Sequence, residues 1–181
     1  MQNDQKTDNI QNSAQPPRAL DAIDRKILGE LTKNADTSYA DLSTRVGLSA
    51  PAVHERVKRL RSSGRIKGTA ALLDGSAVGK PLLAFVHLDT EGWGKTKELM
   101  ALAELPELEE MHSVTGDSCM LLKVRLENSQ ALEGFLAKLY ELPGVRCTKS
   151  YVALTTYLER PVQAGISEGL VMKRFNDEQA M

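Results

Sequence analysis

The chain has 181 residues, of which 41% are hydrophobic and 26% are charged, and its formal net charge is −1. A chain of this length can bury a core in one domain or in two small ones. It contains no run of about eighteen apolar residues and does not start with a basic segment followed by an apolar one. The sequence therefore excludes a membrane-spanning or secreted protein and predicts a soluble, cytoplasmic one.

Charge is distributed unevenly along the chain. Residues 1–17 are rich in Gln, Asn, Asp and Ser without periodicity, and they predict a disordered leader. Residues 18–68 hold eleven basic and six acidic side chains, a difference of +5, whereas residues 69–181 hold eleven basic and sixteen acidic ones, a difference of −5. The basic stretch is therefore the candidate for contact with nucleic acid.

Residues 18–68 predict three helices. The second begins at the capping-box sequence Ser38-Tyr39-Ala40-Asp41, runs to Val46, and ends at Gly47, which can take the left-handed conformation. Before it, Asp21 can cap a first helix whose apolar residues recur at helical spacing. Those residues are Ile23, Ile27, Leu28 and Leu31.

The third helix is predicted over about Ala50 to Ser63. Ser49 can cap it, Pro51 lies in its first turn, where no amide hydrogen is needed, and Gly64 follows its last turn. One stripe of this helix is apolar and predicted to face a core. It consists of Val53, Val57 and Leu60.

The outward side of the third helix is strongly basic. Between Val53 and Gly68 a single acid, Glu55, stands against six basic residues, Arg56, Lys58, Arg59, Arg61, Arg65 and Lys67. A run of charged residues on a helix can also be no more than a face exposed to solvent. However, a helix, a short turn containing glycine and a basic helix together form the helix-turn-helix arrangement, whose second helix enters the major groove of DNA. Residues 65–68 lead into a short extended segment that could form a wing.

The predicted DNA contacts divide by position along the third helix. Residues near its start are expected to meet bases or the adjacent backbone, and the basic residues after them to contact phosphates. Arg56 is either a phosphate contact or a structural ion-pairing residue. The first group is Ser49, Ala50, Pro51, His54 and Glu55, and the second is Arg56, Lys58, Arg59, Arg61 and Lys67.

Residues 69–80 predict a hinge, and residues 81–160 predict a second domain. Its elements follow the order strand, helix, strand, strand, helix, strand. The strands are predicted at 82–88, 108–115, 120–126 and 146–158, and the helices at 95–105 and 131–142, with Gly116-Asp117 as a hairpin turn.

The predicted fold class is α+β, with an N-terminal winged helix-turn-helix followed by a C-terminal ferredoxin-like βαββαβ sandwich. Both helices of the sandwich cover one face of an antiparallel sheet. The other face would expose an apolar patch that a second copy of the chain could cover, and a dimer would present two recognition helices to a symmetric site. This patch is expected to include some of Leu83, Phe85, Tyr151 and Tyr157.

Three parts of the sequence resemble the Lrp/AsnC (feast/famine) transcription regulators. The stretch 49–68, followed by Leu73-Asp74, is similar to their winged-helix signature, and 20–28 and Val114-Thr115-Gly116-Asp117 are similar to other conserved elements of that family. The similarity covers about Leu20 to Arg160. It implies a DNA-binding domain joined by a short hinge to a domain for effector binding and oligomerisation, often in dimers and octamers, that commonly senses amino acids.

The resemblance also implies an effector site between dimers, at the loop after the Val-Thr-Gly element. Turn amides can hold a carboxylate there, and a nearby acid can hold an ammonium group. Many relatives carry Tyr-Asp where this chain has Ser118-Cys119, so the usual aspartate is missing. Asp117 either replaces it or serves only as a turn residue, and thiol-based sensing by Cys119 is a further hypothesis. The expected effector-binding residues are Thr115, Gly116, Asp117, Ser118 and Cys119.

Two other classes of protein compete with this interpretation. An enzyme is disfavoured because the three histidines are not at metal-ligand spacing and no nucleophile or phosphate-binding motif occurs, so no catalytic residue, metal or cofactor is expected. The two cysteines, Cys119 and Cys147, predict neither a disulfide scaffold nor a metal site, and both are expected to be buried thiols. A nucleoid-type architectural protein that binds DNA without a ligand remains the alternative. The extension 161–181 has apolar residues at helical spacing and either docks on a neighbour or trails.

Overall fold

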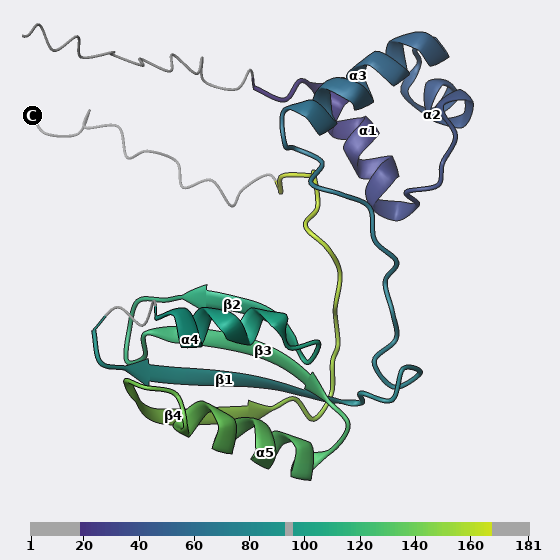
Figure 1. The fold of residues 1–181 in the computed structure, drawn as a ribbon. Helices are drawn as coiled ribbons and strands as arrows, with labels where there is room; N and C mark the ends of the chain where they lie inside the picture. Colours follow the sequence, from purple (N-terminus) through teal and green to yellow (C-terminus); the bar gives the residue numbers. More distant parts are fainter. Residues whose placement is uncertain (1–18, 93–95, 168–181) are drawn as a thin grey trace, which may run out of the picture. The chain divides into compact units, whose positions relative to one another are not determined.

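The computed structural model describes residues 19–92 and 96–167 (Figure 1). The chain forms two compact units, of which the first comprises Met1–Ala70 with Arg160–Met181 and the second comprises Ala71–Glu159. The predicted leader and the apolar residues of the C-terminal extension at 170–175 lie outside the described residues. Within the described ranges no helix is long and apolar enough to cross a membrane.

The first unit contains the three predicted helices, α1 (Ala22–Lys33), α2 (Tyr39–Val46) and α3 (Ala50–Ser62). Side-chain caps define where each of them begins: Asp21 accepts from the amide of Asp24, and Ser38 from that of Asp41. Ser49 caps α3 in the same way. The turn between α2 and α3 is confirmed, with Gly47 in the left-handed conformation at φ 71°.

The three helices enclose one small core. Its buried side chains come from every helix, and the apolar residues predicted at helical spacing in the first and third helices pack into it. The core consists of Ile27, Leu42, Val46, Val53, Val57 and Leu60, with Leu28, Leu31 and Ile66 partly buried against it.

The chain after α3 differs from the prediction in detail. The helix ends at Ser62, one residue earlier than expected, and Gly64 turns the chain at φ 71°. The amides of Arg65 and Ile66 both donate to the carbonyl of Leu60, which holds the start of the expected wing against the helix end. In the described chain, residues 65–70 then form an irregular loop without a strand.

The second unit follows the predicted order of elements. These are β1 (Leu82–Thr90), α4 (Lys97–Met100) with the 3-10 helix η1 (Ala101–Glu104), β2 (Leu108–Ser113), β3 (Met120–Leu126), α5 (Ser129–Tyr140) and β4 (Val145–Val152). The sheet is antiparallel throughout, in the order β2-β3-β1-β4 (Figure 1). This is the arrangement of a ferredoxin-like sandwich.

Both helices of the second unit cover the same face of its sheet. Leu99 and Leu102 from α4 and η1, and Leu132, Phe135 and Leu139 from α5, join one core. The sheet contributes every second residue of its two central strands to that core, as strand geometry requires. These are Ala84, Val86, Leu88, Met120, Leu122, Val124 and Leu126.

Several element boundaries differ from the predictions, among them the end of β1, which lies at Thr90 and not at Leu88. The helix expected at 95–105 begins after the cap Thr96 and tightens into a 3-10 turn at Ala101. Asn128 caps α5, so that helix begins earlier than predicted and ends at Tyr140. The strand expected at 146–158 ends at Val152, opposite Ala84 near the start of its antiparallel partner β1. β2 ends at Ser113, so a longer loop replaces the tight hairpin.

The opposite side of the sheet, which we call the helix-free face, is less apolar than predicted. Leu83 is only 6% exposed and therefore adds little to a patch, while Tyr151 is 56% exposed and Tyr157 lies beyond the end of β4. Charged side chains share this face because they occupy alternate positions on the same strands. The face is formed by Phe85, His87, Asp89, Leu121, Lys123, Arg125, Lys149 and Tyr151.

Candidate DNA-binding surface and effector pocket

The start of α3 presents several side chains to solvent. Pro51, His54 and Glu55 are exposed, and the hydroxyl of Ser49 is engaged in capping, at 3.4 Å from the amide nitrogen of Ala52. The imidazole of His54 also packs edge-on against Tyr39 of α2, with ring centroids 5.2 Å apart. Tyr39 thus orients a predicted base-contacting residue, which its place in the capping-box sequence did not indicate.

Two of the predicted phosphate contacts form an ion-pair network with α1. Arg56 Nη1 lies 2.7 Å from both Asp21 Oδ2 and Asp24 Oδ1, and Arg59 Nη2 lies 3.0 Å from Asp24 Oδ1. The side chain of Asp24 is 7% exposed, so α3 is fixed to α1 through a buried carboxylate. Hydrogen bonds from Arg56 and from the Asp24 amide hold the pKa of Asp21 below its ordinary value. The structural alternative for Arg56 therefore has direct geometric support.

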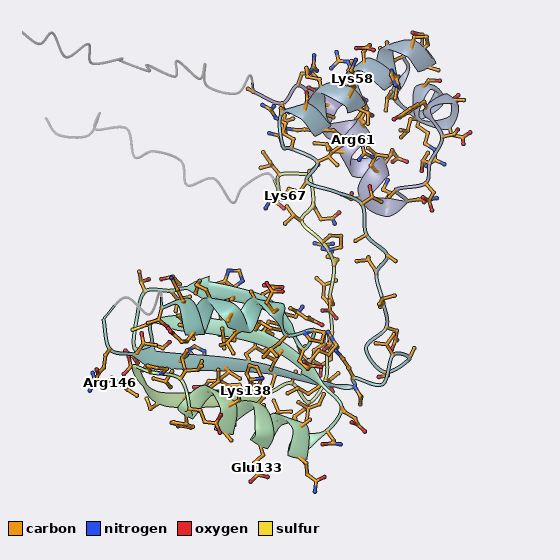
Figure 2. The ribbon with its side chains drawn as sticks, viewed as in Figure 1. Lys58, Arg61, Lys67, Glu133, Lys138 and Arg146 are labelled. Atoms are coloured by element: carbon orange, nitrogen blue, oxygen red, sulfur yellow. The ribbon has the colours of Figure 1, made fainter. Side chains whose placement is uncertain are left out.

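The remaining predicted phosphate contacts are differently placed. Lys58, Arg61 and Lys67 are exposed (Figure 2). In the described part of the chain none of the three makes an ion pair. Their charge is available to an external anion, whereas that of Arg56 and Arg59 is largely satisfied within the unit.

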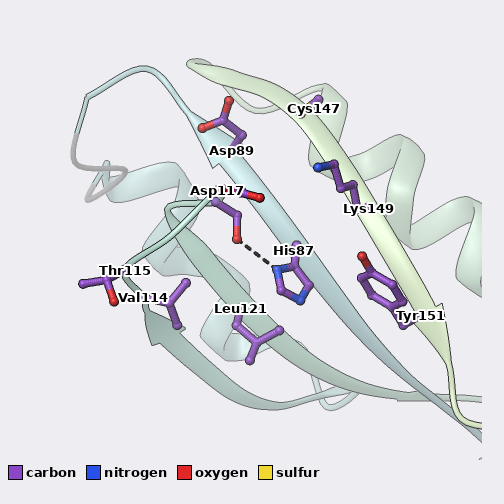
Figure 3. A pocket seen from close by; sticks show the side chains of 10 residues that line it. His87, Asp89, Val114, Thr115, Asp117, Leu121, Cys147, Lys149 and Tyr151 are labelled. Atoms are coloured by element: carbon purple, nitrogen blue, oxygen red, sulfur yellow. Dashed lines mark hydrogen bonds between the residues drawn. The ribbon is translucent and has the colours of Figure 1, made fainter.

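A pocket of about 380 Å³ lies on the helix-free face of the second unit, beside the loop between β2 and β3 (Figure 3). We call it the sheet-face pocket. Of the five predicted effector-binding residues, Thr115, Asp117 and Ser118 line it. Gly116 shapes the loop at φ 123° without forming part of the wall. The other lining residues are His87, Asp89, Val114, Leu121, Cys147, Lys149 and Tyr151.

Contacts inside the sheet-face pocket fix its polar walls. His87 Nδ1 and Ser118 Oγ are 2.9 Å apart, which ties the loop to β1 (Figure 3). The ring of His87 also packs edge-on against Tyr151, at a centroid distance of 5.3 Å. The same wall carries acids, Asp89 and Asp117, and a base, Lys149, so the pocket offers both signs of charge.

Cys119 lies next to this pocket rather than in its wall. It is half-buried and Cys147 is exposed, so the prediction of two buried thiols is wrong. The thiol of Cys119 donates a hydrogen bond to Asp89 Oδ1 at 3.4 Å, and it lines a smaller cavity of about 230 Å³ with Gly92, Ser113 and Val114. The carboxylate of Asp89 thereby lies beside position 119, where the resemblance to the family leads us to expect an aspartate in many relatives.

Sequence reasoning missed the pocket residues contributed by β1 and β4. His87 and Asp89 alternate on one strand, which was a readable signal that they share a face. Lys149 is brought opposite His87, and Tyr151 opposite Phe85, only by the register of β1 with β4. Strand register over that separation cannot be read from a single sequence.

A second ion-pair network lies further along the helix-free face. Lys123 Nζ is 2.7 Å from Glu159 Oε1, and Arg125 pairs with Glu159 at 2.9 Å and with Glu109 at 2.6 Å. The hydrogen bond from Lys123 holds the pKa of Glu159 below its ordinary value. The side chain of Arg125 also packs against Gly75, where an added Cβ would lie 2.6 Å from it. Both chain segments that leave the second unit are thus fixed beside Arg125.

A three-helix unit with a basic recognition helix, followed by a sheet domain with a charged pocket, defines a DNA-binding regulator with a ligand-binding domain. Residues 20–61 match the AsnC-type helix-turn-helix domain, and residues 83–163 match the Lrp/AsnC ligand binding domain. The chain belongs to the Lrp/AsnC family of transcriptional regulators.

Individual relatives agree with this assignment. The HTH-type transcriptional regulator FL11 of Pyrococcus horikoshii is 37% identical over 141 residues, which cover 77% of this chain and 93% of that protein. The leucine-responsive regulatory protein of Haemophilus influenzae is 42% identical over 142 residues, covering 76% and 85% of the two chains.

A solved structure shows the same fold. A transcriptional regulator from Neisseria meningitidis in complex with L-Met superimposes with a TM-score of 0.71 at 27% identity, covering 78% of this chain and 94% of that one. The relatives are named as transcriptional regulators, so the chain is a regulator and not an enzyme.

Proposed function

We propose that this chain is a sequence-specific transcription regulator that binds double-stranded DNA through α3, at the nucleoid in the cytoplasm. Its activity is controlled by an amino acid bound in the sheet-face pocket. The observation that carries the effector proposal is the pairing of acids with a lysine in one cavity, because a zwitterion needs partners of both signs.

The two charged groups of an amino acid would find separate partners in the pocket. Asp89 and Asp117 can accept hydrogen bonds from the ammonium group, while Lys149 and the Tyr151 hydroxyl can donate to the carboxylate. Asp89 is the better acid for this role, because its carboxylate lies 3.4 Å from the thiol of Cys119. It would compensate for the absence of an acid at position 119.

Relatives support an amino acid as the effector class. The Haemophilus influenzae relative is named as leucine-responsive, and the Neisseria meningitidis structure contains L-Met. Leu121 and Val114 give the sheet-face pocket an apolar part that suits a side chain of this kind. The hydrogen bond between Ser118 Oγ and His87 Nδ1 would hold the β2–β3 loop in place beside β1 and so keep the apolar part of the pocket accessible.

On DNA, the residues at the start of α3 would read bases, and the cations that make no ion pair in the described structure would contact phosphates. The first group is Ser49, Ala50, Pro51, His54 and Glu55. Lys58, Arg61 and Lys67 would supply the phosphate contacts, and Arg56 and Arg59 would orient the helix through Asp24. A helix fixed this firmly to α1 presents its base-reading residues in one orientation.

A second copy of the chain would cover part of the helix-free face. Tyr151 is exposed on this face near the end of β4, and Leu154, Tyr157 and Leu158 follow the strand with exposed fractions of 69% or more. Apolar side chains gathered in one segment are typical of an interface between copies. A dimer built in this way, and an octamer assembled from dimers, would present pairs of recognition helices to symmetric sites.

The test of the effector is the thermal midpoint of the full chain against a panel of amino acids. A ligand at a hundredfold its Kd adds about 2.7 kcal/mol, which shifts a midpoint by several degrees. Once an amino acid that raises the midpoint is found, the amine without its carboxylate and the acid without its amino group should both fail to raise the midpoint, because each lacks one of the two charges. Lys149→Gln should weaken binding by about tenfold or more, as expected for a lost charged hydrogen bond.

The matched control is Lys138→Gln, which removes an exposed lysine from α5 on the other face of the sheet. It should bind the effector as the unaltered protein does. If no amino acid shifts the midpoint, and footprints on DNA are broad with weak sequence preference, the effector proposal fails and an architectural protein is favoured.

A further inference from the structure

A cavity outside the sheet-face pocket lies within the first unit and has a volume of about 350 Å³. We call it the basic groove. Its walls come from α1, from the loop after α3, and from the segment 160–164, which belongs to this unit. Arg25 Nη1 donates to the carbonyl of Ala164 at 2.9 Å, so α1 holds the segment that forms one wall. The apolar wall residues are Leu28, Leu31, Ile66 and Val162.

The charged residues that line the basic groove in the described structure are all positive. Arg61 and Lys67 stand at its rim together with Arg65, and among the described residues that line it none is acidic. Arg61 and Lys67 make no ion pair within the described ranges. An apolar cavity whose only charges are cations is the complement of an apolar body that carries a carboxylate.

We propose that the basic groove binds a small carboxylate with an apolar chain, and that this ligand competes with DNA. Its volume lies in the range of about 300–1,000 Å³ that small-molecule sites occupy. None of the described residues that line the groove is an acid that could hold an ammonium group, so the groove favours a plain carboxylate over an amino acid, in contrast to the sheet-face pocket. The competition rests on the proposed phosphate contacts of Arg61 and Lys67, whereas the binding itself does not.

Binding is tested on the full chain with sodium octanoate as the probe, and with octylammonium chloride at equal ionic strength as the charge control. Octanoate should shift the methyl resonances of Leu31, Ile66 and Val162, and octylammonium should not. Ala35→Phe fills the groove from the exposed turn after α1 and should abolish these shifts. Ala103→Phe makes the same change at an exposed position of η1 and should leave them intact.

Competition is tested by the dependence of DNA affinity on salt. Each neutralised phosphate contact contributes about 0.9 to the slope of log K against log salt concentration. With the groove saturated by octanoate, Arg61 and Lys67 are occupied, so the slope should fall by about two. Ala35→Phe, which leaves both cations in place, should keep the full slope in the presence of octanoate.

A second filling variant, Val162→Trp, blocks the opposite wall at a side chain that is 91% exposed, so the result does not depend on one substitution folding well. Equal binding of octanoate by both filled variants, or equal shifts with octylammonium, overturns the site. Methyl shifts without any change of salt slope overturn the competition. If the chain fails to bind DNA at all, the proposed function fails while the methyl shifts still decide the groove.

Discussion

In both units some basic side chains are held in internal ion pairs and others are left for a ligand, but different elements bring this about in each unit. On α3, Arg56 and Arg59 pair with the buried Asp24, and their neighbour Lys58 is exposed. Both kinds of position lie on one helix, so spacings of three and four residues decide which side chain can reach α1. Which of these side chains is paired is decided by the packing of α3 on α1, which carries Asp24.

On the sheet the same division depends on three strands. Lys123 and Arg125 of β3 pair with Glu109 and Glu159, and Lys149 of β4 faces the sheet-face pocket. Strand pairing places these residues near one another across long stretches of chain. A count of basic residues therefore overstates the charge that either unit offers to a ligand, since part of that charge is held in internal ion pairs.

The largest expected effect comes from breaking the network on α3. Asp24→Asn removes a buried carboxylate from two arginines, and we expect the free energy of unfolding to fall by about 2 kcal/mol, less than for a fully enclosed pair because Arg59 is half exposed. Denaturant titration measures this loss. Asp36→Asn, at an exposed acid in the loop after α1, should change stability by less than about 0.5 kcal/mol. Equal effects of the two variants would contradict the role given to Asp24.

Lys58, one of the basic residues of the same helix that make no ion pair in the described structure, should behave in the opposite manner. Lys58→Ala should leave unfolding unchanged but weaken binding to all DNA sequences and reduce the salt slope by about 0.9. Anisotropy titrations at several salt concentrations measure both quantities. Lys138→Ala on α5 is the control, because it removes a helical lysine from the other unit. A slope that is the same in both variants would remove Lys58 from the phosphate contacts.

In the second unit, Glu159→Gln should release the segment after β4. The pair with Lys123 is partly exposed, so the stability change is expected to be at most about 1 kcal/mol. The sharper measurement is amide hydrogen exchange, which should become faster at 153–159 and remain unchanged in α5. Glu133→Gln, at an exposed position of α5, should alter neither region. Unchanged exchange at 153–159 would show that Lys123 and Arg125 do not fix this segment.

The smallest expected effect is a pH dependence of the first unit. Arg56 lowers the pKa of Asp21 in the folded state, so the unfolded chain binds the proton more readily. The contribution of this ion pair to the free energy of unfolding is therefore complete above the ordinary pKa of 3.8. It is lost as the pH falls below that value. Asp21→Asn keeps a good helix cap while removing the charge, so it should flatten the stability curve in this acid range. An identical acid loss in the variant would exclude Asp21 as its source.

Much of the fold could be predicted because its signals are local. Ser38, Ser49 and Gly47 define the helix-turn-helix through caps and a left-handed turn, each within a few residues of the helix end that it affects. The start of α4 was wrong although its cap, Thr96, is an equally local signal. The end of β4 at Val152 was wrong because it depends on the extent of its partner strand β1. A partner strand lies far away in sequence, so its end is not visible in the local pattern.

The sequence by itself determined the order of elements, the apolar stripe of α3 and the loop at Thr115, Asp117 and Ser118, because helical and strand periods act over short distances. Only the tertiary structure decided that Asp24 holds two of the arginines, and that Asp89 and Lys149 complete the sheet-face pocket. These contacts depend on helix packing and strand register, which bring together side chains whose separation along the chain carries no periodic signal.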